Sequence, residues 1–173
     1  MSGPYVLLQF GADPFNLKFE DLEGRPAFTV KEVEENPNLV VQISREADWR
    51  QQHPDIMGPN NSYLYFGPSK SPGYLVYGNG PTQSMMGTIK QKKEGSTSRY
   101  FPAQNGKEFK WRVMPQKMEC MEGRNIIAVW ELSQPEDIFT ARLTIRHPGL
   151  ATVTELFTAL SLNRMAQALN WNQ

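Results

Sequence analysis

The fold is decided by the stretch TVTELFTALSLN, which spans residues 152–163. Its apolar residues recur at helical spacing, at positions 153, 156, 157 and 160. Thr152 and Glu155 match the T-x-x-E capping box, in which each side chain binds a free N–H group of the first helical turn. From Leu156 to Asn163 no charge interrupts the segment. A helix that is apolar over most of its circumference is a buried helix, so we predict that the rest of the chain encloses it.

The chain before this helix has the rhythm of a β protein, because glycine and proline interrupt it at short intervals. The clearest strand is 108–113, where apolar and charged residues alternate. The full set of expected strands is 6–10, 16–20, 27–33, 39–44, 63–66, 73–77, 85–91, 108–113, 117–122, 125–132 and 139–146. Of these, 108–113, 125–132 and 139–146 are expected to form a three-stranded antiparallel meander. Residues 47–61 are expected to form a long loop with one helical turn near 49–52.

Residues 98–112 read SRYFPAQNGKEFKWR. This run resembles the S-R-x-F-x-x-x-x-G-x-x-Y-x-W-R core of an uncharacterised fungal domain, with Phe109 in place of the usual tyrosine. That domain is similar to the tubby C-terminal fold, which phospholipid scramblases and plant LURP-one-related proteins share. The resemblance covers residues 13–168 and implies an antiparallel β-barrel of about a dozen strands around one apolar C-terminal helix. By fold-level analogy alone, the wider tubby group also implies binding to phosphoinositides or membrane surfaces.

Bulk composition excludes several classes of protein. The 173 residues fit one domain, 1–173, and 39% hydrophobic with 21% charged residues is ordinary globular composition. Eighteen basic and eighteen acidic side chains cancel, so we expect no nucleic-acid partner. The N-terminal apolar run is short and lacks a basic region before it, and no apolar stretch reaches membrane-spanning length. We therefore expect a soluble cytoplasmic protein that can also sit at the membrane periphery.

Basic residues are concentrated between positions 90 and 124, which hold nine basic and four acidic side chains. Within this region the candidate anion-binding residues are Lys90, Lys92, Arg99, Lys110 and Arg112. If their strands are neighbours, the cations converge on a phosphate headgroup, and the candidate partner is an anionic membrane surface or a phosphoinositide. The alternative is a solvated outer face whose charges keep the sheet soluble. The order of the strands in the sheet decides between these two interpretations, and the local sequence pattern does not reveal that order.

Aromatic residues supply a second candidate site, made of Tyr63, Tyr65, Tyr74 and Tyr77. Together with the 47–61 loop they would line a pocket at one barrel mouth, suited to a small molecule or an enzyme substrate. The alternative is that they pack the barrel wall, because aromatic residues are common in strands. A third possible role is a protein-interaction scaffold, whose sign would be an exposed apolar patch.

No motif for a cofactor, a metal or catalysis is present. The sequence contains no P-loop, dinucleotide fingerprint, G-x-S-x-G or zinc-finger spacing. His53 and His147, the only two histidines, lack a recognised ligand spacing, so we expect no metal. Cys120, the single cysteine, lies in an alternating strand without a nearby base, and we expect it to be a buried structural residue. The sequence thus favours a non-enzymatic binding module without a cofactor and leaves catalysis and protein partners open.

Overall fold

In the computed structural model, which describes residues 4–54, 56, 58–103 and 106–171, twelve strands form one antiparallel sheet. The strands are β1 (Tyr5–Phe10), β2 (Leu17–Asp21), β3 (Pro26–Glu34), β4 (Val40–Arg45), β5 (Asn61–Tyr65), β6 (Tyr74–Tyr77), β7 (Thr82–Ser84), β8 (Ser98–Pro102), β9 (Glu108–Val113), β10 (Lys117–Glu122), β11 (Asn125–Leu132) and β12 (Ala141–Ile145). They pair in the order β7-β6-β5-β4-β3-β2-β1-β12-β11-β10-β9-β8. The predicted mainly β fold of about a dozen strands with a C-terminal helix is confirmed.

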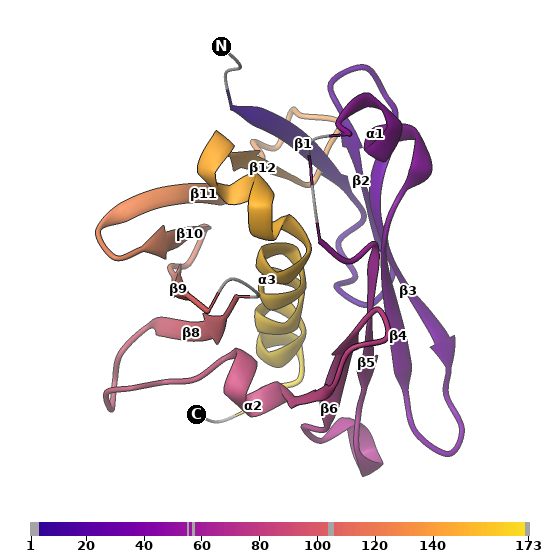
Figure 1. Cartoon of the computed structure of the whole chain (residues 1–173), viewed down its shortest axis with the longest axis vertical. Coiled ribbons are helices and arrows are strands. Elements are labelled where there is room, and N and C mark those ends of the chain that lie inside the picture. The colour runs from indigo at the N-terminus through magenta and orange to yellow at the C-terminus, as the bar shows by residue number, and fades with distance from the viewer. Residues whose placement is uncertain (1–3, 55, 57, 104–105, 172–173) are drawn as a thin grey trace.

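The sheet consists of two meanders that meet where β1 pairs with β12. Its edges are β7 and β8, which do not pair with each other within the described residues, so the barrel-like wall is open along one line. Short helices accompany the strands: α1 (Ala47–Gln52) and α2 (Met85–Thr88), with 3-10 turns at Pro68–Lys70 and His147–Thr152. Figure 1 shows the two halves of the sheet curving around the long C-terminal helix α3 (Val153–Ala168).

Helix α3 is buried because apolar residues are spread over most of its circumference. Thirteen of its sixteen residues are buried, including all ten from Val153 to Leu162. Phe157 lies at the centre, stacked on Phe28 of β3 at 4.2 Å between ring centroids and edge-on to Phe19 of β2 at 4.8 Å. Burial of this kind contributes about 1.5–3 kcal/mol for each large apolar side chain. The predicted enclosed helix is therefore the core of the molecule.

Polar groups on α3 are hydrogen-bonded to both halves of the wall. The indole Nε1 of Trp111 on β9 donates to the carbonyl oxygen of Leu156 at 3.1 Å. On the other side, the hydroxyls of Ser62 on β5 and Thr158 lie 2.8 Å apart. Because unpaired buried polar groups are costly, these bonds fix the rotation of the helix within the sheet.

Two predicted elements differ from the structure. Residues 85–91 were expected as a strand, yet 85–88 form α2, because the Ser84 hydroxyl accepts the Gly87 N–H at 2.9 Å and caps a helical turn. The predicted three-stranded meander is also wrong in its order. Strand β10 lies between β9 and β11 and pairs with both, so 108–113 does not contact 125–132 as a neighbour. The helical turn expected near 49–52 is present as α1.

The predicted capping box at the start of α3 is absent. Thr152 has φ −127° and ψ 33°, and its side chain makes no capping hydrogen bond. The 3-10 turn His147–Thr152 runs directly into the helix, so Thr152 lacks the extended backbone that a capping side chain needs. Glu155, the other residue of the predicted box, is buried instead.

Candidate functional site

The outer face of β8 and β9 gathers three of the five predicted cations. Lys90 is hydrogen-bonded to Tyr100 through both backbone groups, at 3.0 and 2.8 Å, and Tyr100 pairs in turn with Lys110. Directly opposed residues of antiparallel strands point to the same face, so both lysines flank the tyrosine. Lys92 joins them: its Nζ lies 4.1 Å from the Tyr100 ring centroid, and that of Lys110 lies 5.7 Å away. We call Lys90, Lys92, Tyr100 and Lys110 the lysine cluster.

Carboxylates neutralise part of this outer face. Lys92 forms an ion pair with Glu108, and Arg112 forms one with Glu119, which also lies 3.6 Å from Lys117. The hydrogen bond from Arg112 holds the pKa of Glu119 below its usual range. Arg112 thus belongs to an ion-pair network beside the lysine cluster rather than to the cluster itself.

Two lysines keep an uncompensated charge. Lys90 is exposed and Lys110 half-buried, and neither forms an ion pair with any residue that the structure describes. Next to Lys110 the surface is hollowed by about 220 Å³, between Tyr100, Glu108, Phe109, Lys110, Met121 and Gly123. A negatively charged group can approach Lys110 there, and Lys90 lies on the same face, on the other side of Tyr100.

Arg99, the remaining predicted cation, lies on the opposite side of the sheet. It pairs with Trp111, whose fully buried side chain faces α3, whereas its neighbour Tyr100 faces outward. The side chain lines a cleft of about 350 Å³ between the inner face of β8–β9 and the end of α3. The prediction that Arg99 converges with the lysines is wrong, because alternate residues of a strand point to opposite faces.

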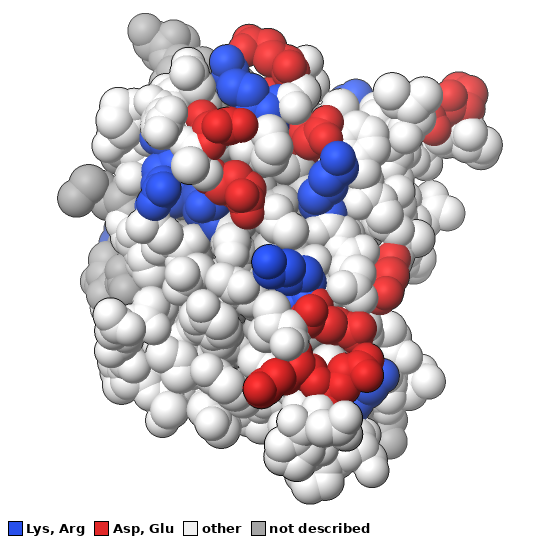
Figure 2. All heavy atoms as spheres, turned by 90° about the vertical axis from the view of Figure 1, so that its right-hand side faces the viewer, with Lys and Arg blue, Asp and Glu red and all other residues white. Residues whose placement is uncertain are grey.

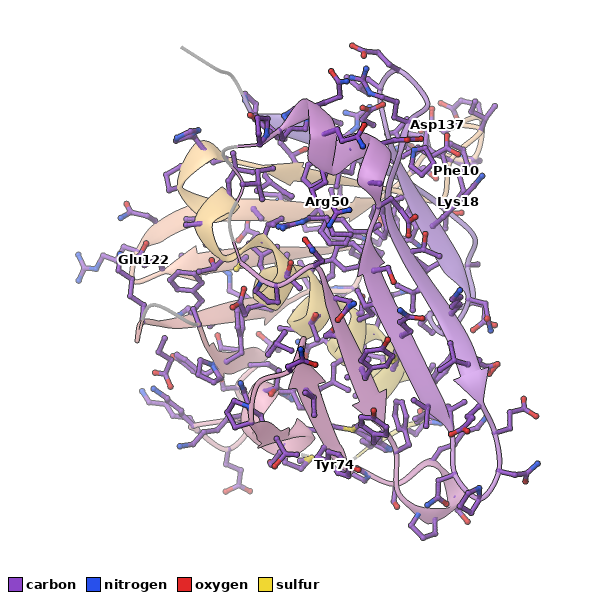
Figure 3. All side chains as sticks on the ribbon, turned by 45° about the vertical axis from the view of Figure 1, so that its right-hand side comes forward. Phe10, Lys18, Arg50, Tyr74, Glu122 and Asp137 are labelled. Carbon is purple, nitrogen blue, oxygen red and sulfur yellow. The ribbon has the colours of Figure 1, made fainter. Side chains whose placement is uncertain are left out.

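The four predicted tyrosines do not share a face. Tyr63, Tyr65 and Tyr74 form a stack on the outside of β5 and β6, with centroid distances of 6.3 and 4.8 Å. Tyr77 is buried on the inner side next to α3, and burial raises its pKa. The three outer rings contact each other on the outside of the sheet and therefore do not line a pocket together with Tyr77. Figure 3 shows Tyr74 at the lower part of the sheet, far from Glu122 at the tip of the β10–β11 hairpin next to the lysine cluster's strands.

Figure 2 presents the side on the right of Figure 1, where the basic side chains lie next to acidic ones and acidic side chains gather in the lower part. Lys18 on β2 is paired with Glu20 at 2.9 Å, and its Nζ lies 6.0 Å from the centroid of the Phe10 ring. Figure 3 shows Lys18 and Phe10 close together on the right side of the view. The uncompensated lysines of β9 and its neighbour are therefore a local feature.

A buried polar group that sequence reasoning missed lies under the 46–60 segment. Glu155 is 1% exposed, and neither of its carboxylate oxygens accepts a hydrogen bond within the described residues. Burial raises its pKa, and the nearby backbone N–H of Glu155 itself and the positive charge of Arg45 on β4 partly offset that rise. Arg45 is itself 5% exposed and donates to Asn60 Oδ1 at 2.9 Å. Arg45 is the last residue of β4 and has the same phase as buried Ile43, and this alternation was the sequence signal for its burial.

His53 and Cys120, two candidates for metal or thiol chemistry, pack against neighbouring side chains. His53 packs against Tyr5 and Trp49 in tilted arrangements, with ring centroids 4.6 and 5.1 Å away. Asp55, the carboxylate close to His53 in the sequence, lies outside the described residues. Among the described residues no three histidine, cysteine or carboxylate side chains gather as a metal site would require. Cys120 is fully buried, as predicted, and burial raises its pKa well above the usual value.

Comparisons with known proteins add little to this geometry. No protein-family model matches the chain, and no curated protein matches it. Among solved structures, the chain is similar to the X-ray structure of a protein from Arabidopsis thaliana, at 14% sequence identity and a TM-score of 0.48. The alignment covers 98% of this chain and 93% of that one. No helix in the described part of the chain is long and apolar enough to cross a membrane.

Proposed function

We propose that this protein is a non-enzymatic, tubby-like binding module that holds anionic phospholipid headgroups at the lysine cluster. The observation that carries the proposal is the meeting of Lys90 and Lys110 around Tyr100 without a carboxylate partner in the described residues. The resemblance of residues 98–112 to a tubby-like motif supports it, since Tyr100 and Lys110 of the cluster lie within that motif.

The chemistry of the cluster suits a membrane surface better than a buried ligand. Lysine ammonium groups on flexible stems attract an anionic surface at about 1 kcal/mol for each residue near it. Tyrosine is enriched at membrane–water interfaces, because one end of its ring is apolar and the phenol is polar. Tyr100 between Lys90 and Lys110 provides both features at one place.

The overall charge balance makes this attraction local and sensitive to salt. The chain carries no net charge, so distant charges do not draw it to the membrane. Attraction that depends on exposed lysines is screened over a Debye length of about 8 Å at physiological ionic strength. We expect weak, reversible binding that anionic lipid strengthens and added salt weakens.

Co-sedimentation with vesicles tests the proposal. Phosphatidylcholine vesicles with and without phosphatidylserine are compared, using the wild-type chain and the double variant Lys90→Gln/Lys110→Gln. Two lysines at about 1 kcal/mol each predict a fall of about 30-fold in the partition coefficient on phosphatidylserine vesicles.

A matched control is the double variant Lys18→Gln/Lys31→Gln, which removes the same charge from the β2–β3 face. It should bind phosphatidylserine vesicles as the wild type does. Binding that is independent of phosphatidylserine, or equal losses in the two double variants, would show that the lysine cluster is not a headgroup site.

A further inference from the structure

A second cavity lies at the end of α3, on the side of the sheet opposite to the lysine cluster. It measures about 350 Å³, which is within the size range of small-molecule sites, and it would hold about a dozen water-sized groups. Its walls come from two strands and the helix end: Thr97, Arg99, Val113, Asn163, Ala166, Gln167, Asn170 and Trp171. No acidic side chain is among them.

Arg99 brings an uncompensated positive charge into this cleft. Its Nη1 donates to the carbonyl oxygens of Ser96 and Ser98, at 2.6 and 3.1 Å, and its other N–H groups find no acceptor in the described part of the chain. No carboxylate pairs with it there. A partly desolvated guanidinium without a counter-charge is costly, and an anion in the cleft would relieve that cost.

The end of α3 does not explain the position of Arg99. An arginine near a helix C-terminus often binds the last free carbonyl groups. Here the chain itself uses them: the N–H groups of Leu169, Asn170 and Trp171 bind the carbonyls of residues 165, 167 and 166. Asn170 adopts φ 56°, which closes the helix in a Schellman arrangement. The guanidinium is therefore not needed as a cap.

The other residues that line the cleft indicate what kind of ligand would fit beside Arg99. Val113, Ala166 and Trp171 form an apolar side, and Asn163, which is 5% exposed, adds a side-chain amide whose nitrogen already donates to Ala159. One guanidinium balances one negative charge and can bind a carboxylate with two parallel hydrogen bonds. A doubly charged phosphate would call for a second cation, and the cleft has none among its lining residues.

From these contacts we propose that the Arg99 cleft binds a small organic acid, with its carboxylate on the guanidinium and its apolar body against Trp171. This site is separate from the proposed headgroup site, because Arg99 and Lys110 lie on opposite faces of neighbouring strands. The sequence pattern predicted a small-molecule pocket at a barrel mouth lined by four tyrosines. The Arg99 cleft is such a cavity, but none of those tyrosines lines it.

Isothermal titration calorimetry of the full chain with 4-phenylbutanoate and the neutral 4-phenylbutanamide tests the proposal. The two probes have the same shape and differ in charge. We expect saturable binding of the acid and binding at least about tenfold weaker for the amide, as loss of a charge-assisted hydrogen-bonded pair predicts. Lys90→Gln/Lys110→Gln should bind the acid as the wild type does.

Three variants locate the site. Arg99→Gln should weaken binding of 4-phenylbutanoate at least about tenfold, whereas Arg124→Gln, in the exposed β10–β11 turn, should leave it unchanged. Thr97→Phe fills the cleft without altering charge and should also weaken binding, which keeps the test decisive if Arg99→Gln fails to fold. Equal affinity for acid and amide, unaltered binding by folded Arg99→Gln or by Thr97→Phe, or no binding at millimolar acid would each overturn the proposal.

Discussion

Replacing Glu155 with glutamine should stabilise the protein increasingly as the pH rises. Burial raises the pKa of Glu155, with Arg45 as a partial offset and Tyr77 as the other titratable neighbour in the described residues. A raised folded-state pKa means that the folded state holds the proton more tightly than the unfolded state. The stabilising effect is complete below the unfolded pKa, about 4.3, and is lost as the pH rises through the folded value.

The magnitude follows from the same geometry. Within that pH window a single group lowers the free energy of unfolding by at most about 1.4 kcal/mol per pH unit. Glu155→Gln cannot ionise and so avoids this loss, although Arg45 reduces it by offsetting part of the charge. We therefore expect the variant to gain on the wild type by up to about 1.4 kcal/mol for each pH unit between the unfolded and the folded pKa of Glu155.

Urea unfolding of the wild type and Glu155→Gln at several pH values measures this difference directly. Glu94→Gln, which removes an exposed carboxylate, is the matched control and should keep a constant offset from the wild type. Parallel stability profiles for the wild type and Glu155→Gln, or a variant that loses stability at alkaline pH, would refute the reasoning. In the second case Glu155 and Arg45 would act as a stabilising ion pair.

Two further predictions concern the core. Phe157→Ala removes the ring stacked on Phe28 and should cost about 3–5 kcal/mol, on the order of 10 °C in Tm, whereas Ile138→Ala at an 89% exposed position should change stability by less than about 0.5 kcal/mol. Calorimetry that finds equal Tm values for the two variants would contradict the central placement of the helix. Cys120 should react with a thiol reagent such as dithionitrobenzoate only as fast as the protein unfolds, since burial raises its pKa and excludes the reagent. Reaction at the rate of a free thiol in native buffer would show that β10 opens locally.

Sequence pattern was sufficient for features that depend on neighbours along the chain. Alternating residues such as Phe109 and Trp111 predicted β9, because one face of a strand meets the core. Arg99 lies two residues before the buried Phe101, so both side chains point to the inner face of β8. The prediction overlooked this because it grouped the cations by charge and not by strand face. Residues 85–91 were misread because Met85 and Ile89 are buried at a spacing that both a strand and a helical turn allow.

The sequence by itself determined that this chain forms many antiparallel strands and then one enclosed helix. An uncharged segment such as 156–163 has no side suited to water, whatever surrounds it. Only the tertiary structure decided that Lys90 and Lys110 flank Tyr100, that Arg99 lines a cleft and that Glu155 is buried near Arg45. Those outcomes depend on strand order, register and the fit of the helix, which are set by contacts between residues distant in the chain, and a local pattern does not contain them.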